Sequence, residues 1–161
     1  MEHQLKIVIG CDLAAYDFKM SLLEILQGRG YIITDVGCFS SKEGDYPIYG
    51  RLVGEKVASA EYDRGIVMCG TGQGICISAN KVKGVRAALC YDVLPALLSR
   101  EHNNSNVLAT GAWLVTPEHA ARIVEAWLFG KYSAGRHDVR LKQIADIENG
   151  TSTIPASGGK A

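Results

Sequence analysis

The sequence lacks the features that mark nucleic-acid-binding, membrane and zinc proteins. Its 17 basic residues are balanced by 17 acidic ones and no basic run occurs, which argues against nucleic acid or an anionic membrane as a partner. No apolar segment is long enough to span a membrane and the N-terminus has no signal-peptide profile, so we expect a cytoplasmic protein. The 5 cysteines are odd in number and lack metal-ligand spacing, which disfavours a disulfide framework or a zinc site.

What the chain does contain is a regular alternation of strand and helix patterns. With 161 residues, 47% of them hydrophobic, we expect one domain over residues 1–149 and a disordered polar tail over residues 150–161. Short apolar runs predict five strands, and helical spacing or caps predict six helices, with a loop over residues 37–47. The strands are predicted at residues 5–9, 31–36, 65–69, 85–90 and 106–110, and the helices at 18–27, 49–60, 75–81, 93–101, 117–130 and 136–148. Such alternation predicts an α/β fold, with a parallel sheet between two layers of helices.

A glycine-rich turn between a predicted strand and a predicted helix carries the strongest chemical signal. It reads Cys69-Gly70-Thr71-Gly72-Gln73-Gly74. The glycines let several amide groups converge, and the helix dipole adds positive charge there, so the turn predicts an anion cradle that favours the thiolate of Cys69. Its spacing fits neither the dinucleotide fingerprint nor the phosphate-binding loop. A buried structural cysteine beside an ordinary turn is the alternative, but the adjacency of the two features favours a base or nucleophile beside an oxyanion site.

Two further polar clusters are candidates for function. Residues 99–106 offer His102 as an acid or base with amide groups beside it, although a solvated helix end with capping asparagines explains the same segment. Arg136 and Arg140 lie four residues apart, so they share one face of a helix and can bind a phosphate or a carboxylate. An ordinary surface helix is equally compatible with the arginine pair. In parallel sheets ligands bind beyond the carboxyl ends of the strands, and Asp12, Cys69 and the segment around His102 all fall at such ends or on nearby loops.

A series of collinear motifs over about residues 6–148 resembles the ribose-5-phosphate isomerase B and galactose-6-phosphate isomerase family. The motifs are Gly10-Cys11-Asp12, Asp45-Tyr46-Pro47, Cys69-Gly70-Thr71-Gly72-x-Gly74, Ala79-Asn80-Lys81, Gly84-Val85-Arg86-Ala87, Ser99-Arg100-x-His102-Asn103, Asn106-Val107-Leu108-Ala109 and Gly135-Arg136-His137. The resemblance implies a three-layer α/β/α Rossmann-like sandwich with a five-stranded parallel sheet. It also implies interconversion of an aldose phosphate and a ketose phosphate without metal or cofactor. The expected assembly is a homodimer or dimer of dimers, with active sites between subunits.

The resemblance also implies a role for each matching residue. Cys69 corresponds to the base that moves a proton between C1 and C2 through a cis-enediolate, and Thr71 contacts the reacting end of the sugar. The amides of residues 70–74, with Gly70, Gly72 and Gly74 among them, correspond to the anion hole. The other expected roles are ring opening and proton transfer for Asp12 and His102, a pocket wall for Tyr46, an enediolate contact for Asn103 and phosphate binding for Arg136 and Arg140. We expect His102, Asn103 and the arginines to face Cys69 across the subunit interface.

Two positions depart from the family pattern. Where the family commonly has a histidine after the aspartate and an arginine after strand five, this chain has Leu13 and Trp113. Both usual side chains are associated with phosphate binding, and each lost charge-assisted hydrogen bond is worth roughly 1.5–3 kcal/mol. We therefore expect lower activity on ribose 5-phosphate than typical members have.

Ribose 5-phosphate isomerisation is the leading interpretation of the sequence. The same chemistry on another sugar is the alternative: allose 6-phosphate, galactose 6-phosphate, a tetrose phosphate or an unphosphorylated sugar. Two further interpretations are a non-catalytic sugar-phosphate-binding protein and a subunit of a hetero-oligomer. The presence of Cys69 and His102 argues against the first, and the presence of both halves of the site in one chain argues against the second.

Overall fold

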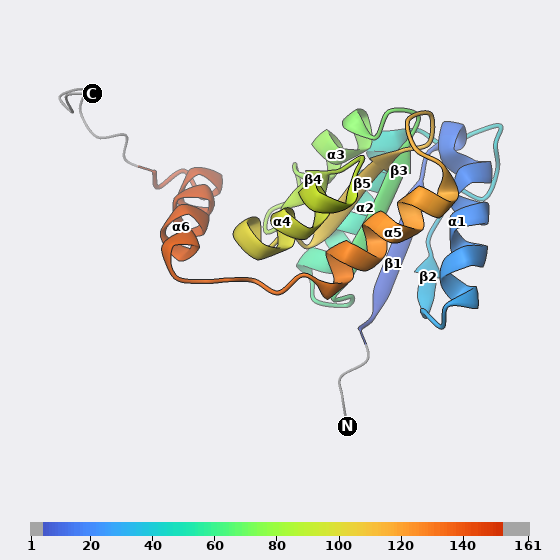
Figure 1. The fold of residues 1–161 in the computed structure, drawn as a ribbon. Coiled ribbons are helices and arrows are strands. Elements are labelled where there is room, and N and C mark those ends of the chain that lie inside the picture. The colour runs from blue at the N-terminus through green and yellow to red at the C-terminus, as the bar shows by residue number, and fades with distance from the viewer. Residues whose placement is uncertain (1–4, 153–161) are drawn as a thin grey trace.

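A five-stranded parallel sheet forms the centre of the molecule (Figure 1). The computed structural model describes residues 5–152. The strand order is β2-β1-β3-β5-β4, so the chain moves outward from β1 first to one side and then to the other. The strands are β1 (Ile7–Cys11), β2 (Ile33–Asp35), β3 (Arg64–Cys69), β4 (Ala87–Leu89) and β5 (Val107–Gly111). This arrangement confirms the predicted fold class, and it places the carboxyl ends of β1, β3 and β5 side by side at one edge.

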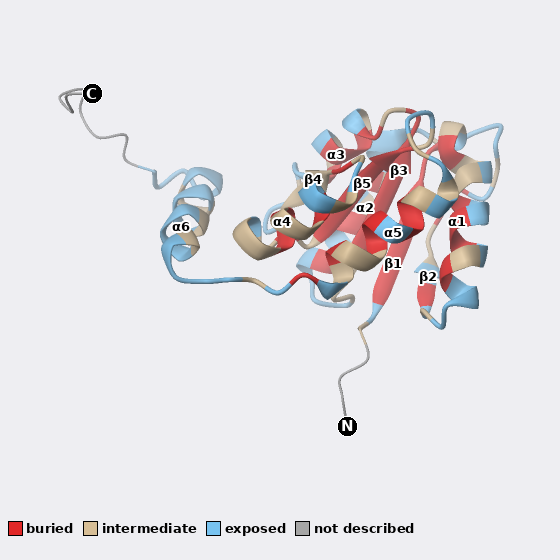
Figure 2. Cartoon of the chain, viewed as in Figure 1, coloured by how far each residue is buried: buried red, intermediate tan, exposed pale blue. Residues whose placement is uncertain are grey.

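Helices cover both faces of the sheet. On one face lie α1 (Tyr16–Gly28), α4 (Val93–Asn103) and α5 (Pro117–Phe129), and on the other lie α2 (Tyr46–Ala58) and α3 (Gln73–Ala79). Strands β1 and β5 are buried along their whole length, as Figure 2 shows, and they are composed mostly of apolar residues because both of their faces are covered. Two hydrophobic clusters result, one around Leu22, Ile123 and Trp127 and the other around Val53 and Ile75.

The last helix, α6 (Arg136–Glu148), stands away from the sheet (Figures 1 and 2). Each of its residues is exposed or half-buried, and Val139, Ile144 and Ile147 present apolar side chains to solvent. Its C-terminal end touches the domain where the Glu148 carboxylate accepts a hydrogen bond from the Gly84 amide, at 3.0 Å to each oxygen. A helix with unburied apolar side chains gains little stability from its own chain.

Several predicted boundaries were wrong, each for a local reason. Helix α2 begins at Tyr46 inside the predicted loop over residues 37–47, because Pro47 occupies the first turn, where proline suits a helix start. Helix α4 extends through Asn103, so His102 lies in its last turn, and Asn104 ends it in a left-handed conformation with φ 46°. The short 3-10 turn η1 (Leu13–Ala15), which Asp12 caps, was not predicted from the sequence.

Most of the predicted tail, residues 153–161, lies outside the described residues. None of the helices within residues 5–152 combines the length and the apolar character that a membrane span requires.

Candidate active site

A cavity of about 450 Å³ opens at the carboxyl ends of β1 and β3, next to the start of α3. This is where the strand order reverses, the usual place for ligands in such sheets. Predicted and unpredicted residues line it together: Asp12, Ala14, Tyr46, Cys69, Gly70, Thr71, Gln73, Gly74, Ile77 and Trp113. Seven of these ten were candidates from the sequence, and the fold brings them to one place.

Cys69 is the last residue of β3 and lies at the wall of this cavity with 4% of its surface exposed. Its Sγ accepts a hydrogen bond from the Gly72 amide at 3.1 Å, which favours negative charge on the sulfur. The turn requires glycine at position 72, because its φ is +80° and an added Cβ would lie 2.5 Å from the Thr110 carbonyl oxygen. An amide beside the thiol is therefore built into the backbone of the turn.

The glycine-rich turn is fixed by the chain that follows β5. The amides of Ala112 and Trp113 donate to the carbonyl oxygens of Cys69 and Gly70 at 3.0 and 2.9 Å. Gly70 lets the Trp113 indole pack on the turn, since a Cβ there would lie 2.7 Å from the ring. The indole remains 71% exposed and forms one wall of the cavity.

Asp12 follows β1 and is almost fully buried beside the same cavity. Its Oδ1 accepts a hydrogen bond from the Ala15 amide at 3.1 Å. Burial raises the pKa of the Asp12 carboxyl, and the nearby Asp45 adds to this, while the hydrogen bonds from the Ala15 and Ala14 amides oppose it. A carboxyl that keeps its proton to higher pH is suited to giving that proton to a sugar oxygen.

The remaining predicted residues form a second group at the end of α4 and the start of α6. His102 stacks on His137, with ring centroids 4.6 Å apart and planes 11° apart. Arg140 donates from Nη1 to the Arg136 carbonyl at 2.8 Å, and both arginine side chains are exposed. Asn103 lines a different pocket, between the β4 region and α6.

Within one chain, then, the fold does not bring His102, Asn103, Arg136 and Arg140 to the Cys69 cavity. They lie outside its lining, as does Leu13, an exposed residue of η1.

Sequence reasoning did not find several neighbours of the site. Gln73 and Ile77 line the cavity from one side of α3, and their spacing of four residues is the signal that predicts a shared face. His137 belongs to the motif Gly135-Arg136-His137, but the family resemblance implies no role for it. Tyr91 donates its hydroxyl to the Thr71 carbonyl at 2.6 Å, a contact between segments 20 residues apart for which the sequence offers no signal.

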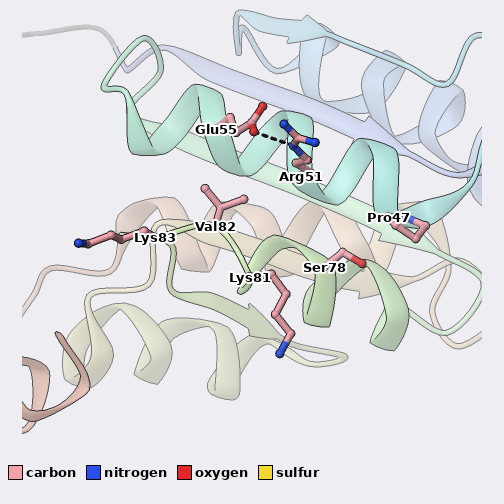
Figure 3. Close-up of a pocket in the computed structure, with 7 residues that line it drawn as sticks. All are labelled: Pro47, Arg51, Glu55, Ser78, Lys81, Val82 and Lys83. Atoms are coloured by element: carbon pink, nitrogen blue, oxygen red, sulfur yellow. Dashed lines mark hydrogen bonds and ion pairs between the residues drawn. The ribbon is translucent and has the colours of Figure 1, made fainter. Parts of the chain in front are cut away.

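Another pocket, of about 510 Å³, lies between α2 and the α3 region (Figure 3). Its one carboxylate, Glu55, is held by Arg51 at 2.7 Å, and Figure 3 shows Lys81 and Lys83 directed away from that pair. Because its only acid is already paired, this pocket is poorly equipped for proton transfer, whereas the Cys69 cavity combines a thiol, a carboxyl and the glycine-rich turn. Among the described residues, no group of three or more His, Cys, Asp or Glu side chains is arranged to hold a metal ion.

The chain is similar to known proteins over most of its length. The family model described as Ribose/Galactose Isomerase matches residues 7–144. Ribose-5-phosphate isomerase B of Escherichia coli is 46% identical over 143 residues, which cover 89% of this chain and 96% of that protein. D-erythrulose-4-phosphate isomerase of Pectobacterium atrosepticum is 38% identical over 146 residues, covering 90% of this chain and 96% of that one. The structure of Clostridium thermocellum ribose-5-phosphate isomerase B superposes with a TM-score of 0.88 at 45% identity, covering 92% of this chain and all of that one.

Proposed function

We propose that this chain, which belongs to the ribose/galactose isomerase family, interconverts ribose 5-phosphate and ribulose 5-phosphate with Cys69 as the base. Membership of the family makes it a sugar-phosphate isomerase that interconverts an aldose and a ketose. The observation that carries the proposal is the thiol at the wall of a cavity with the Gly72 amide donating to its sulfur. The family match over residues 7–144 also supports our expectation of a single isomerase domain over residues 1–149.

The proposed reaction moves two protons within the sugar. Asp12, acting with His102, gives a proton to the ring oxygen and receives one from the hydroxyl at C1, which opens the ring. The Cys69 thiolate then removes the proton from C2, and the electrons move to the C1 oxygen to give a cis-enediolate. The amides of residues 70–74 stabilise this oxyanion. Transfer of the hydroxyl proton from O2 to O1 and return of the thiol proton to C1 complete the ketose, so the enzyme ends in its starting state.

We propose that a second copy of the chain completes each site. The residues that line the Cys69 cavity within the described range 5–152 include no lysine, arginine or histidine, so a phosphate there has no cationic partner from the same chain. The cations are carried by Arg136 and Arg140 on α6, a helix whose apolar side chains remain unburied. A homodimer, or a dimer of dimers, that places α6 and the end of α4 over the partner's cavity would bring cations to the phosphate and would bury the apolar side chains of α6.

A different sugar is the second candidate substrate, and Trp113 is the observation that favours it. Its exposed indole stands at the cavity where the family pattern has an arginine, and Leu13 replaces a histidine nearby. An aromatic face packs on the apolar side of a sugar but does not neutralise a phosphate. The candidates are allose 6-phosphate, galactose 6-phosphate, a tetrose phosphate and an unphosphorylated sugar, and the D-erythrulose-4-phosphate isomerase relative supports the four-carbon member.

A cytoplasmic location is part of the same proposal. A phosphorylated sugar is charged, and moving such a charge through a lipid core unaided is very costly.

Exchange of the C2 proton tests the proposed base. The unmodified protein and Cys69→Ala are incubated with ribose 5-phosphate and with each alternative sugar in deuterated water, and isomerisation is measured in parallel. Cys90→Ala is the matched control, because Cys90 is a buried thiol of the core outside the cavity. We expect exchange and turnover with ribose 5-phosphate, a loss of about 100-fold or more in Cys69→Ala, and little change in Cys90→Ala.

Three results would change the assignment. Equal exchange in Cys69→Ala and the unmodified protein would remove Cys69 as the base. Greater turnover of another sugar would replace ribose 5-phosphate as the substrate. No exchange with any sugar would leave a sugar-phosphate-binding protein as the better account.

Mixed oligomers test the shared site. Cys69→Ala and His102→Asn each remove one half of the site, so each alone is expected to be nearly inactive. When the two chains are co-expressed, a mixed dimer holds one cavity with both halves intact, and activity returns. If mixing restores no activity although mixed dimers form, the two halves do not meet across subunits.

A further inference from the structure

One peptide unit connects the Tyr91 hydroxyl to the Cys69 sulfur. The peptide between Thr71 and Gly72 accepts a hydrogen bond from Tyr91 at its carbonyl oxygen, at 2.6 Å. The amide of the same peptide donates to Cys69 Sγ at 3.1 Å. The C=O and N–H of a trans peptide point in opposite directions, so the phenol and the thiol lie at the two ends of a single line of hydrogen bonds.

Tyr91 lies outside the cavity that Cys69 lines. It follows β4 near the edge of the sheet, is half-buried, and donates its hydroxyl to the turn. The carbonyls of Cys69 and Gly70 are held by backbone amides, whereas the Thr71 carbonyl is held by this side chain. The orientation of the peptide that serves the sulfur therefore depends on a group that a single substitution can remove.

We infer that Tyr91 is a positioning residue that controls how strongly the Gly72 amide supports negative charge on Cys69. A donor at the carbonyl end of a peptide polarises it and strengthens donation from its N–H end. The short contact also holds the peptide in the orientation that points the amide at the sulfur. When Cys69 is a thiolate this amide stabilises it, so Tyr91 increases the fraction of the reactive form without touching the sugar. This inference rests on the proposed function only in so far as it concerns turnover.

Tyr91→Phe is the direct test, because it deletes the hydroxyl and keeps the ring. Tyr62→Phe is the matched control, since Tyr62 is also half-buried but lies at the opposite end of the sheet, beside the start of β1. The first measurement is the rate of Cys69 alkylation by iodoacetamide as a function of pH, without sugar, with the modified residue identified by mass spectrometry. We expect the midpoint of this profile to move upward by about 0.4–1 pH unit in Tyr91→Phe, and to stay in place in Tyr62→Phe.

The second measurement is steady-state isomerisation. We expect kcat to fall about two- to tenfold in Tyr91→Phe while KM changes by less than about twofold, because the lost interaction supports the reacting sulfur and not sugar binding. An unchanged alkylation midpoint overturns the inference, including when kcat and thermal stability fall together, because that combination describes a merely structural tyrosine. If the unmodified protein turns over none of the sugars, the proposed function fails by itself, and the alkylation profile still decides the role of Tyr91.

Discussion

Replacing Gly72 by alanine is the sharpest available test of the glycine-rich turn. The φ of Gly72 is +80°, and alanine in a left-handed conformation costs about 1–2 kcal/mol. The added Cβ would also lie 2.5 Å from the Thr110 carbonyl oxygen and 2.8 Å from Leu89 Cδ1. Since the closest atom belongs to the backbone of β5, the clash is relieved only by moving the turn, and such overpacking costs about a further 1–3 kcal/mol.

Gly30→Ala separates these two costs. Gly30 has a φ of +89° in the turn after α1, and its added Cβ would meet no atom within 4 Å. Both variants therefore carry the conformational penalty, but only Gly72→Ala carries the clash. At equal protein concentration, thermal unfolding should show a Tm about 2–12 °C lower in Gly72→Ala than in Gly30→Ala.

Activity should separate the two variants further. Moving the turn takes the Gly72 amide away from the sulfur and displaces the neighbouring amides of the proposed anion hole. Loss of one oxyanion-hole donor reduces kcat by about 100- to 1000-fold in comparable sites. Gly30→Ala should keep the kcat of the unmodified protein. If the two alanine variants have equal Tm values and equal kcat, the turn is not fixed by the contact with β5, and our account of the anion hole is wrong.

Two other predictions concern the ion pair between Lys19 and Asp35 and the stacked rings of His102 and His137. Lys19 is fully buried and donates to Asp35 at 2.6 Å and to the Cys38 carbonyl oxygen at 2.7 Å, so Lys19→Met should lower the free energy of unfolding in urea by about 1.5–3 kcal/mol through the loss of these charge-assisted hydrogen bonds. In His137, desolvation and then the neighbouring His102, Arg136 and Arg140 hold the pKa below its ordinary 6.5, so its NMR titration midpoint should lie below that value and rise in Arg140→Gln.

Each of these predictions has a defined control and a defined failure. Arg51→Met breaks an exposed pair with Glu55 and should cost only about 0–1 kcal/mol; an equal cost for Lys19→Met would contradict the argument from burial. For His137, the unfolded state binds more protons between the lowered pKa and 6.5, so the His137 contribution to stability rises with pH across that window. A titration midpoint at or above 6.5 would show that the imidazole is not held neutral.

Most of the fold could be predicted from the sequence because each strand is marked by residues that are adjacent in the chain. Continuous apolar runs mark strands buried on both faces, and the alternation with helices leaves a parallel sheet as the consistent solution. Helix ends were harder to predict. Pro47 starts α2 inside a segment rich in turn residues, and the polar residues at the end of α4 resemble a loop although Asn104 ends the helix after them.

The candidate site, like the fold, could be predicted from the sequence only in part. Cys69 and its glycines could be picked out from the sequence because they lie within one turn, where close spacing brings the Gly72 amide to the thiol. The Tyr91 contact depends on how β4 and β3 are placed across the sheet, and no local pattern encodes it. The separation of Arg136 and Arg140 from the cavity is visible only in three dimensions, because it follows from the position of α6 away from the sheet (Figure 1).

The projection of α6 makes the proposed activity subject to mass action. Every chain carries a thiol cavity and a helix that bears Arg136 and Arg140, but by the arrangement we propose the two work together only while copies remain associated. Dilution would then remove turnover from a protein whose secondary structure and core are intact, and specific activity would rise with enzyme concentration until association saturates. Such a dependence on concentration would be a property of this one unburied helix, not of the sheet that supports the chemistry.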